Sequence, residues 1–238
     1  MKLKKKSFNK KIILFENGEQ KITPDIFCPK PASRFLPDWY KDLAPYHGNK
    51  IINGENPTFT GKKCSPLFDA ISSGYIITTH CDINVECNDG LFYFNWKVED
   101  RVVDSHPNLQ VGNHPNKQKN AGMYKFNNTW IIKTPPGYSC IIIPPMHRDN
   151  PLIILPGIVD TDLYTDIINF PFYVKDGFSG VIPAGTPIAQ IIPFKREPWK
   201  QERGGRELLI EKGEVFKLIK SKFVNAYKDF YWSRKSYE

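Results

Sequence analysis

Short runs of alternating hydrophobic and polar residues fill the central part of the chain. Residues 74–85 and 91–98 are rich in β-branched and aromatic side chains, and the turn Asn88-Asp89-Gly90 separates them. Two such runs around an Asp-Gly turn predict a β-hairpin. Five further strands are predicted at about 126–134, 138–144, 152–156, 166–174 and 188–194. Proline- and glycine-rich turns separate them, without a helical pattern, so we expect a mainly β, antiparallel barrel or sandwich.

The two ends of the chain follow different patterns. Prolines interrupt residues 1–64 throughout, which predicts an irregular lead-in that wraps the folded part. Residues 65–198 contain the predicted β domain. Within residues 199–238, apolar side chains recur at intervals of three and four between positions 211 and 231, which predicts an amphipathic helix. We therefore expect three segments, with the only long helix close to the C-terminus.

Composition narrows the class of protein. The chain has 238 residues, of which 40% are hydrophobic and 24% charged, as in an ordinary globular protein. No apolar run approaches the roughly 18 residues that a membrane span needs. We expect a cytoplasmic protein without membrane contact. The five cysteines are scattered without a CxxC pair, so we expect free thiols and no metal site.

Positive charge is concentrated at the N-terminus. Residues 1–12 contain six lysines and no acidic residue. A terminal lysine run is ordinarily a solvated tail, but it also binds polyanions without sequence preference. Both interpretations stay open, and the second predicts weak nucleic-acid contact.

Three segments resemble motifs of the dUTPase and dCTP-deaminase superfamily, also called the β-clip fold. Residues 134–144 (TPPGYSCIIIP) are similar to its strand-turn-strand, and residues 155–164 (LPGIVDTDLY) to its Gly-Ile-Asp-Ser-Asp-Tyr signature. Residues 182–192 (IPAGTPIAQII) are similar to its closing strand. Together they cover about a quarter of the chain, in the family's order. The sequences of residues 134–145, 157–173 and 182–198 also resemble a phage and bacterial family of unknown function. If a phage encodes the protein, we expect it in the host cytoplasm or the virion.

The resemblance implies roles for several residues. Asp160 occupies the position that activates water in the hydrolase, a reaction that normally needs Mg²⁺ to mask the phosphate charge. Asp162 and Tyr164 would border the sugar of a nucleotide, and Gln190 would contact the ligand from the closing strand. The alternative is that Asp160 and Asp162 only form a turn, because Asp readily hydrogen-bonds its own backbone. The family usually assembles as a homotrimer, which we expect here too.

His147 and Arg148 form a second candidate site. A guanidinium binds phosphate or carboxylate with two hydrogen bonds, and an imidazole adds a donor that titrates near neutral pH. The alternative is a solvated loop in which Arg148 makes only a surface contact with Asp149. The residues themselves do not decide between these interpretations.

Departures from the family's pattern decide the predicted function. Residues 145–150 (PMHRDN) stand where the family has the serine and glycine that hold the phosphates, and Pro187 replaces an arginine. The glycine-rich C-terminal arm has no clear counterpart, and residues 166–174 lack the glutamate of the deaminase branch. We expect a non-enzymatic or degenerate module, such as a phage structural or host-interaction protein, with dUTP hydrolysis absent or very slow. The alternative is a Mg-dependent nucleoside triphosphate pyrophosphatase; no other cofactor is expected.

Overall fold

The computed structural model describes residues 11–18, 24–47, 58–107, 110, 112, 114, 122–221 and 227–238. The chain divides into two compact units. The first, here called the β domain, comprises Met1–Lys30, Tyr75–Pro145 and Asp149–Arg196. The second unit comprises Pro31–Gly74, Met146–Arg148 and Glu197–Glu238. Most of the N-terminal lysine run lies outside the described residues.

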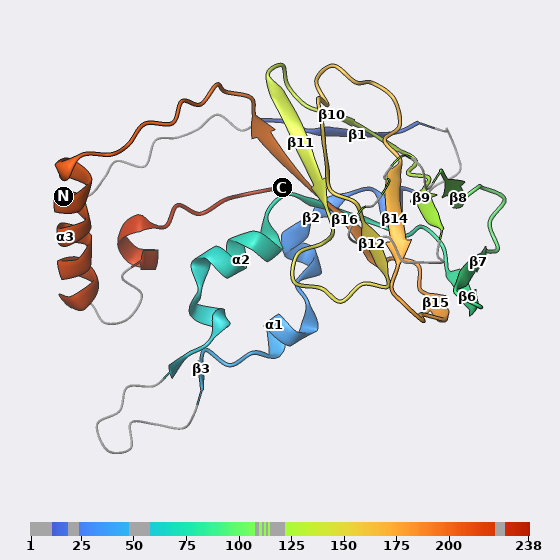
Figure 1. The fold of residues 1–238 in the computed structure, drawn as a ribbon, viewed down its shortest axis with the longest axis horizontal. Coiled ribbons are helices and arrows are strands. Elements are labelled where there is room, and N and C mark those ends of the chain that lie inside the picture. Colours follow the sequence, from blue (N-terminus) through green and yellow to red (C-terminus); the bar gives the residue numbers. More distant parts are fainter. Residues whose placement is uncertain are drawn as a thin grey trace. The chain divides into compact units, whose positions relative to one another are not determined.

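The β domain is built from antiparallel strands, which confirms the mainly β prediction (Figure 1). Its strands are β1 (Leu14–Asn17), β5 (Tyr75–Thr78), β6 (Ile83–Asn88), β7 (Leu91–Asn95), β8 (Val103–His106), β9 (Met123–Phe126), β10 (Trp130–Lys133), β11 (Tyr138–Ile143), β12 (Leu152–Ile154), β13 (Gly157–Val159), β14 (Phe170–Val174), β15 (Gly180–Ile182) and β16 (Pro187–Lys195). A single turn of 3₁₀ helix, η1 (Asp25–Phe27), precedes β5 in this unit.

The strands form several sheets. One sheet contains, in this order, β13, β11, β16 and β5, and a second contains β12, β14, β9 and β8. A third has the order β15-β6-β7, and β1 pairs with β10. The predicted hairpin is β6-β7, and its turn residues Asp89 and Gly90 have φ of 51° and 78°. Positive φ at both central residues is the geometry of a type I′ turn, which suits the twist of the two strands.

The core of the β domain lies between these sheets. Most of its largest fully buried side chains are aromatic or branched aliphatic, and they come from many of the strands; they include Ile77, Ile83, Phe126, Ile132, Leu152, Ile154, Phe170, Phe172 and Ile182. Two buried thiols, Cys81 and Cys140, also belong to this cluster. Burial raises the pKa of Cys81 to about 11, so this thiol is protonated at neutral pH.

The second unit is mainly helical. Its elements are η2 (Ala32–Phe35), α1 (Asp38–Asp42), β3 (Tyr46–His47), β4 (Thr58–Phe59), η3 (Gly61–Lys63), α2 (Ser65–Ser72), α3 (Arg206–Ser221) and η5 (Tyr227–Tyr231), and the two-residue strand β2 (Lys30–Pro31) begins it. No helix in the described part of the chain is long and apolar enough to cross a membrane.

Three boundaries differ from the sequence pattern. The β region was expected from Ser65, but residues 65–72 form α2, because Pro66 lies in the first turn, where its fixed φ favours a helix. The C-terminal helix begins at Arg206 rather than near 211, because the five residues after Gly205 include strong helix formers. The sequence pattern predicts no strand between positions 98 and 126, but Val103–His106 form β8, in which Asp104 pairs with Lys125 of β9.

Candidate functional site

The register of β11 and β13 places Asp160 beside Ser139. Cys140 pairs with Val159 across these two antiparallel strands, so the residues just beyond each of them are neighbours. Ser139 Oγ donates a hydrogen bond to Asp160 Oδ1 at 2.6 Å. The Asp160 side chain remains 53% exposed, so one side of this carboxylate faces solvent.

Arg196 joins both acids of the signature. It directly follows β16, and its backbone N–H donates to the Gly137 carbonyl at 2.8 Å, at the turn that precedes β11. Its guanidinium Nη1 donates to Asp162 Oδ1 at 2.7 Å, and Nη2 donates to Oδ2 of the same carboxylate. Nη1 also lies 3.2 Å from Asp160 Oδ1. We call Ser139, Asp160, Asp162 and Arg196 the Asp–Arg clasp.

Asp162 is the most constrained member of the clasp. Its side chain is 4% exposed, and the Gly137 N–H donates a further hydrogen bond to Oδ2 at 2.7 Å. The hydrogen bond with Arg196 is the main cause that lowers the pKa of Asp162 to about 2, and the Gly137 N–H lowers it further. Asp162 is therefore ionised throughout the physiological range.

Buried polar groups hold the loop that carries these acids. The Thr134 and Thr161 hydroxyls lie 2.7 Å apart and share a hydrogen bond, and both side chains are buried. Lys133 Nζ donates to the backbone carbonyl of Asp162 at 2.6 Å. The chain from β10 through the turn at Gly137 is thus fastened to the loop that follows β13. This loop is a fixed part of the fold.

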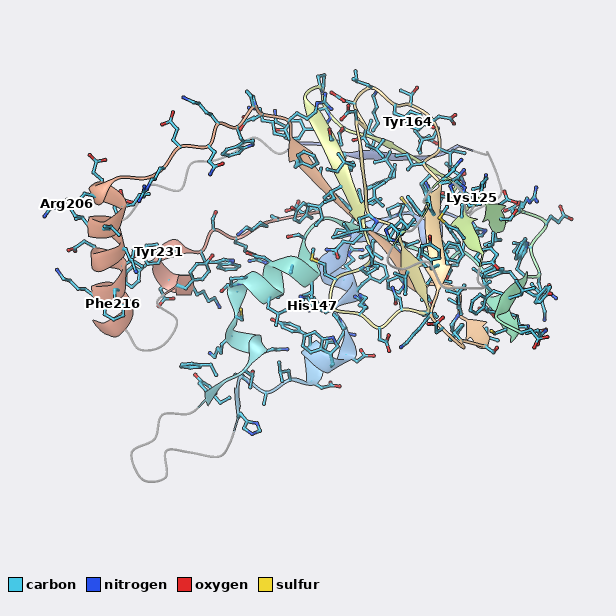
Figure 2. All side chains as sticks on the ribbon, in the orientation of Figure 1. Lys125, His147, Tyr164, Arg206, Phe216 and Tyr231 are labelled. Atoms are coloured by element: carbon cyan, nitrogen blue, oxygen red, sulfur yellow. The ribbon has the colours of Figure 1, made fainter. Side chains whose placement is uncertain are left out.

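Tyr164 and Gln190 lie in contrasting surroundings. Tyr164 is exposed on the loop between β13 and β14 (Figure 2). Its backbone N–H donates to the Asp160 carbonyl at 2.8 Å, and its hydroxyl donates to the Ile167 carbonyl at 3.4 Å. Gln190 is buried in β16, opposite Ile143 of β11 and Ile76 of β5. A ligand at Tyr164 meets open surface, whereas a ligand at Gln190 would have to enter the sheet.

His147 and Arg148 belong to the second unit. Trp39 Nε1 donates to the His147 carbonyl at 2.9 Å, and the two rings meet edge to face with centroids 6.5 Å apart. His147 has a φ of 56°, which is uncommon for a residue with a side chain. Arg148 is half-buried; burial lowers its pKa, and the negative charge of Asp38 raises it. The six predicted residues thus fall into two units.

Ser139 and Arg196 were not predicted from the sequence. Arg196 immediately follows the closing strand, and that position is the signal that identifies it, because β16 pairs Lys195 with Tyr138 at the start of β11. Ser139 lies within the matched turn and strand of residues 134–144, but its role depends on Asp160, 21 positions away along the chain.

The clasp does not suit Mg²⁺. A divalent cation needs carboxylate oxygens that are available as ligands. Both oxygens of Asp162 already accept hydrogen bonds from N–H groups, and the Arg196 guanidinium lies between the two acids. In the described residues, no group of three or more His, Cys, Asp or Glu side chains has the arrangement of a metal site.

Comparisons with known proteins give limited information. No protein-family model and no curated protein matches the chain. Among solved structures, the chain is similar to a mutant dUTPase from phage phi11 of S. aureus, described with a coordinated structural Mg(II) ion. The TM-score is 0.30 and the identity 11%, over 56% of this chain and 83% of that chain. A likeness at this level does not establish a shared fold or activity.

The clasp predicts a defined dependence of stability on pH. Because the folded-state pKa of Asp162 is lowered to about 2, the unfolded chain binds the proton more tightly than the folded chain does. The clasp's contribution is complete above the ordinary Asp pKa of about 4 and is lost as the pH falls towards 2. Asp162→Asn should therefore be less stable than the wild type at pH 7, by a difference that shrinks below pH 4.

Guanidinium unfolding midpoints of both proteins between pH 2 and pH 7 measure this difference. Asp149→Asn is the matched control, since it removes an exposed carboxylate whose partner, Lys175, lies at 2.9 Å. We expect this control to change the midpoint little at pH 7. A difference between Asp162→Asn and the wild type that stays constant down to pH 2 would contradict the assignment.

Proposed function

We propose that the β domain is a degenerate dUTPase-like module in which the acidic signature closes the fold instead of activating water. The observation that carries this proposal is the engagement of both carboxylates. Asp162 is held by Arg196 and Gly137, and Asp160 Oδ1 is shared between the Ser139 hydroxyl and the same guanidinium. A general base needs a carboxylate oxygen that is aimed at the water and ready to take its proton. In the clasp, Asp160 Oδ1 is directed at the Ser139 hydroxyl and the Arg196 guanidinium instead.

The sequence departures support the same proposal. Residues 145–150 lack the serine and glycine that hold phosphates in the family that the chain resembles, and Pro187 replaces its arginine. His147 and Arg148 of this segment belong to the second unit, where Trp39 contacts His147. The sequence therefore offers no clear equivalents of the phosphate-binding residues of the resembled enzyme.

A role in assembly or host interaction fits the outer face of the β13-β11-β16 sheet. Ile141 of β11 lies directly between Ile158 of β13 and Ile192 of β16. Ile158 and, further along β16, Phe194 are exposed. Contiguous apolar side chains on a sheet surface mark contacts between proteins. We propose that this face contributes to a homotrimer of a phage-type structural or host-interaction protein.

The alternative, a nucleotide pyrophosphatase, is favoured by one observation. Asp160 is half exposed, and Tyr164 is exposed close to it through the hydrogen bond between their backbones. A substrate can therefore reach the solvent side of Asp160. In that case Mg²⁺ would have to arrive with the nucleotide, because the clasp offers it no free pair of carboxylates.

Assays of phosphate release from dUTP, dCTP and dATP with Mg²⁺ separate the two functions. We expect turnover at background level, since the loss of one positioned electrostatic donor typically lowers a rate by about 10²–10³ and the phosphate cradle lacks several. The proposal fails if the wild type hydrolyses dUTP, Asp160→Asn abolishes that activity and Asp149→Asn retains it. Thermal unfolding reports binding separately, because a ligand at 100 times its Kd stabilises by ~2.7 kcal/mol.

A further inference from the structure

The helix α3 exposes an unusual number of large apolar side chains. Leu208, Leu209, Ile210 and Phe216 are each more than half exposed within this one helix. Figure 2 labels Arg206 at the start of α3 and Phe216 further along it. In water, intrinsic propensity alone gives little stability to a helix whose described apolar side chains are largely exposed. Its apolar residues therefore point to a partner surface.

Three of these four side chains share one side of the helix. At 100° per residue, Leu208, Leu209, Val215 and Phe216 lie within a stripe about 120° wide. Lys212 falls at the centre of this stripe, and Ile210 falls on the opposite side. We call this surface the α3 seam. Its width is that of a helix that packs against another helix.

Charge is sorted on the two borders of the α3 seam. Beyond one border lie three acidic residues, Glu207, Glu211 and Glu214; beyond the other lie two basic residues, Arg206 and Lys217. Glu214 and Lys217 meet across the back of the helix at 3.2 Å, where both are exposed. An exposed pair of this kind contributes little and leaves both charges available to a partner.

The acidic and basic borders of the α3 seam favour one kind of partner helix and one orientation. In a parallel pair of identical helices, each border faces the opposite border of its neighbour, so acidic residues meet basic ones. In an antiparallel pair each border faces its own copy, and like charges meet. We infer that the α3 seam binds, in parallel, the α3 seam of a second copy of this chain. This inference is independent of the function proposed for the β domain.

An anionic membrane surface fits the helix less well. The sequence of α3 (Arg206–Ser221) contains four basic and three acidic residues, so 4 − 3 leaves an excess of a single positive charge. A helix that lies on an anionic membrane carries an excess of lysine and arginine on its polar side. A second α3 seam in parallel places the three acidic border residues opposite the two basic ones.

Lys212 adds a second expectation. A single lysine within an otherwise apolar seam lowers the stability of a helix pair and restricts its register. In a parallel pair the two Lys212 residues lie at the same level, so the pair forms reversibly. Lys212→Leu should remove this repulsion and tighten association by about tenfold or more.

Light scattering over a range of protein concentrations tests the seam. We expect the wild type to form assemblies of more than one chain, and Leu209→Gln to weaken that association by about tenfold or more. Ile210→Gln is the matched control, because Leu209 and Ile210 are exposed to similar extents, 68% and 61%, on different sides of α3. The inference is wrong if the wild type stays monomeric, if both substitutions act alike, or if Lys212→Leu does not tighten association.

A border exchange tests the orientation. The exchanged variant carries Glu207→Lys, Glu211→Lys and Glu214→Lys together with Arg206→Glu and Lys217→Glu. In parallel pairing it associates with itself but is repelled by the wild type, so tagged wild-type protein should retain less than about one-tenth as much of it as of untagged wild type. Preferential mixing of the two would show antiparallel pairing and overturn the inference. Circular dichroism verifies the helix content, and the Lys212→Leu and Leu209→Gln results stand if the exchanged helix unfolds.

Discussion

Replacing Phe172 by alanine is expected to lower the free energy of unfolding of the β domain by about 3–5 kcal/mol. Phe172 is fully buried in β14. Its ring meets Phe94 at a centroid distance of 6.0 Å and an interplanar angle of 90°, and it lies 5.9 Å from the ring of Tyr124. Alanine removes these contacts and leaves a cavity that rigid strands on either side fill only in part.

Denaturant unfolding of the wild type and the variant measures this effect. Tyr93→Ala is the control, because Tyr93 is also an aromatic residue of a strand, β7, but is exposed. We expect that control to change the stability by less than about 1 kcal/mol. If both variants lost a similar amount of unfolding free energy, the aromatic side chains around Phe172 would not form part of the buried core.

Replacing Asp69 by alanine is expected to release the C-terminal segment from α2. Asp69 Oδ2 accepts hydrogen bonds from Trp232 Nε1 at 2.9 Å and from Lys235 Nζ at 2.7 Å. Its side chain is 15% exposed, so water replaces these partners poorly. A hydrogen bond to a charged group contributes about 1.5–3 kcal/mol. Its loss should raise amide exchange in residues 227–238 by about 10- to 100-fold.

Hydrogen exchange followed by mass spectrometry resolves this segment from the rest of the chain. Asp38→Ala is a suitable control, since Asp38 forms an exposed ion pair with Lys41 at 2.8 Å in the same unit. Exchange in residues 227–238 should be unchanged in that control. Unchanged exchange in Asp69→Ala would mean that other contacts, such as the hydrogen bond between Tyr237 and Ser73, hold the segment.

Strands of the β domain could be predicted from the sequence where the residues of the turn between them have strong conformational preferences. The β6-β7 hairpin follows from Asp89 and Gly90, because few other residues tolerate positive φ at both central positions of a turn. The helix α2 was missed because its eight residues directly precede a strand and are too short to show a clear helical period. Pro66 in its first turn was the available signal.

The candidate site was predictable only in part. The spacing of Asp160 and Asp162 identifies an acidic loop, but the group that neutralises it comes from Arg196, 34 positions beyond Asp162. Only the pairing of β11 with β16 brings these residues together, and such non-local register is not visible in a local motif. For Gln190, by contrast, the local motif suggests a role that the sheet does not support. Its motif suggests a ligand contact, whereas its position in a strand paired on both sides buries it.

The position of β16 has a consequence for how the protein is made. This strand pairs with both β11 and β5, yet it is the last strand of the β domain to be synthesised. From Thr78, the end of β5, to Pro187 the ribosome must add 187 − 78 = 109 residues. At ordinary elongation rates this takes roughly 5–20 seconds. Until β16 emerges, the edge of β5, and later that of β11, lacks the strand that covers it in the folded protein, and such open edges are where nascent chains associate with one another.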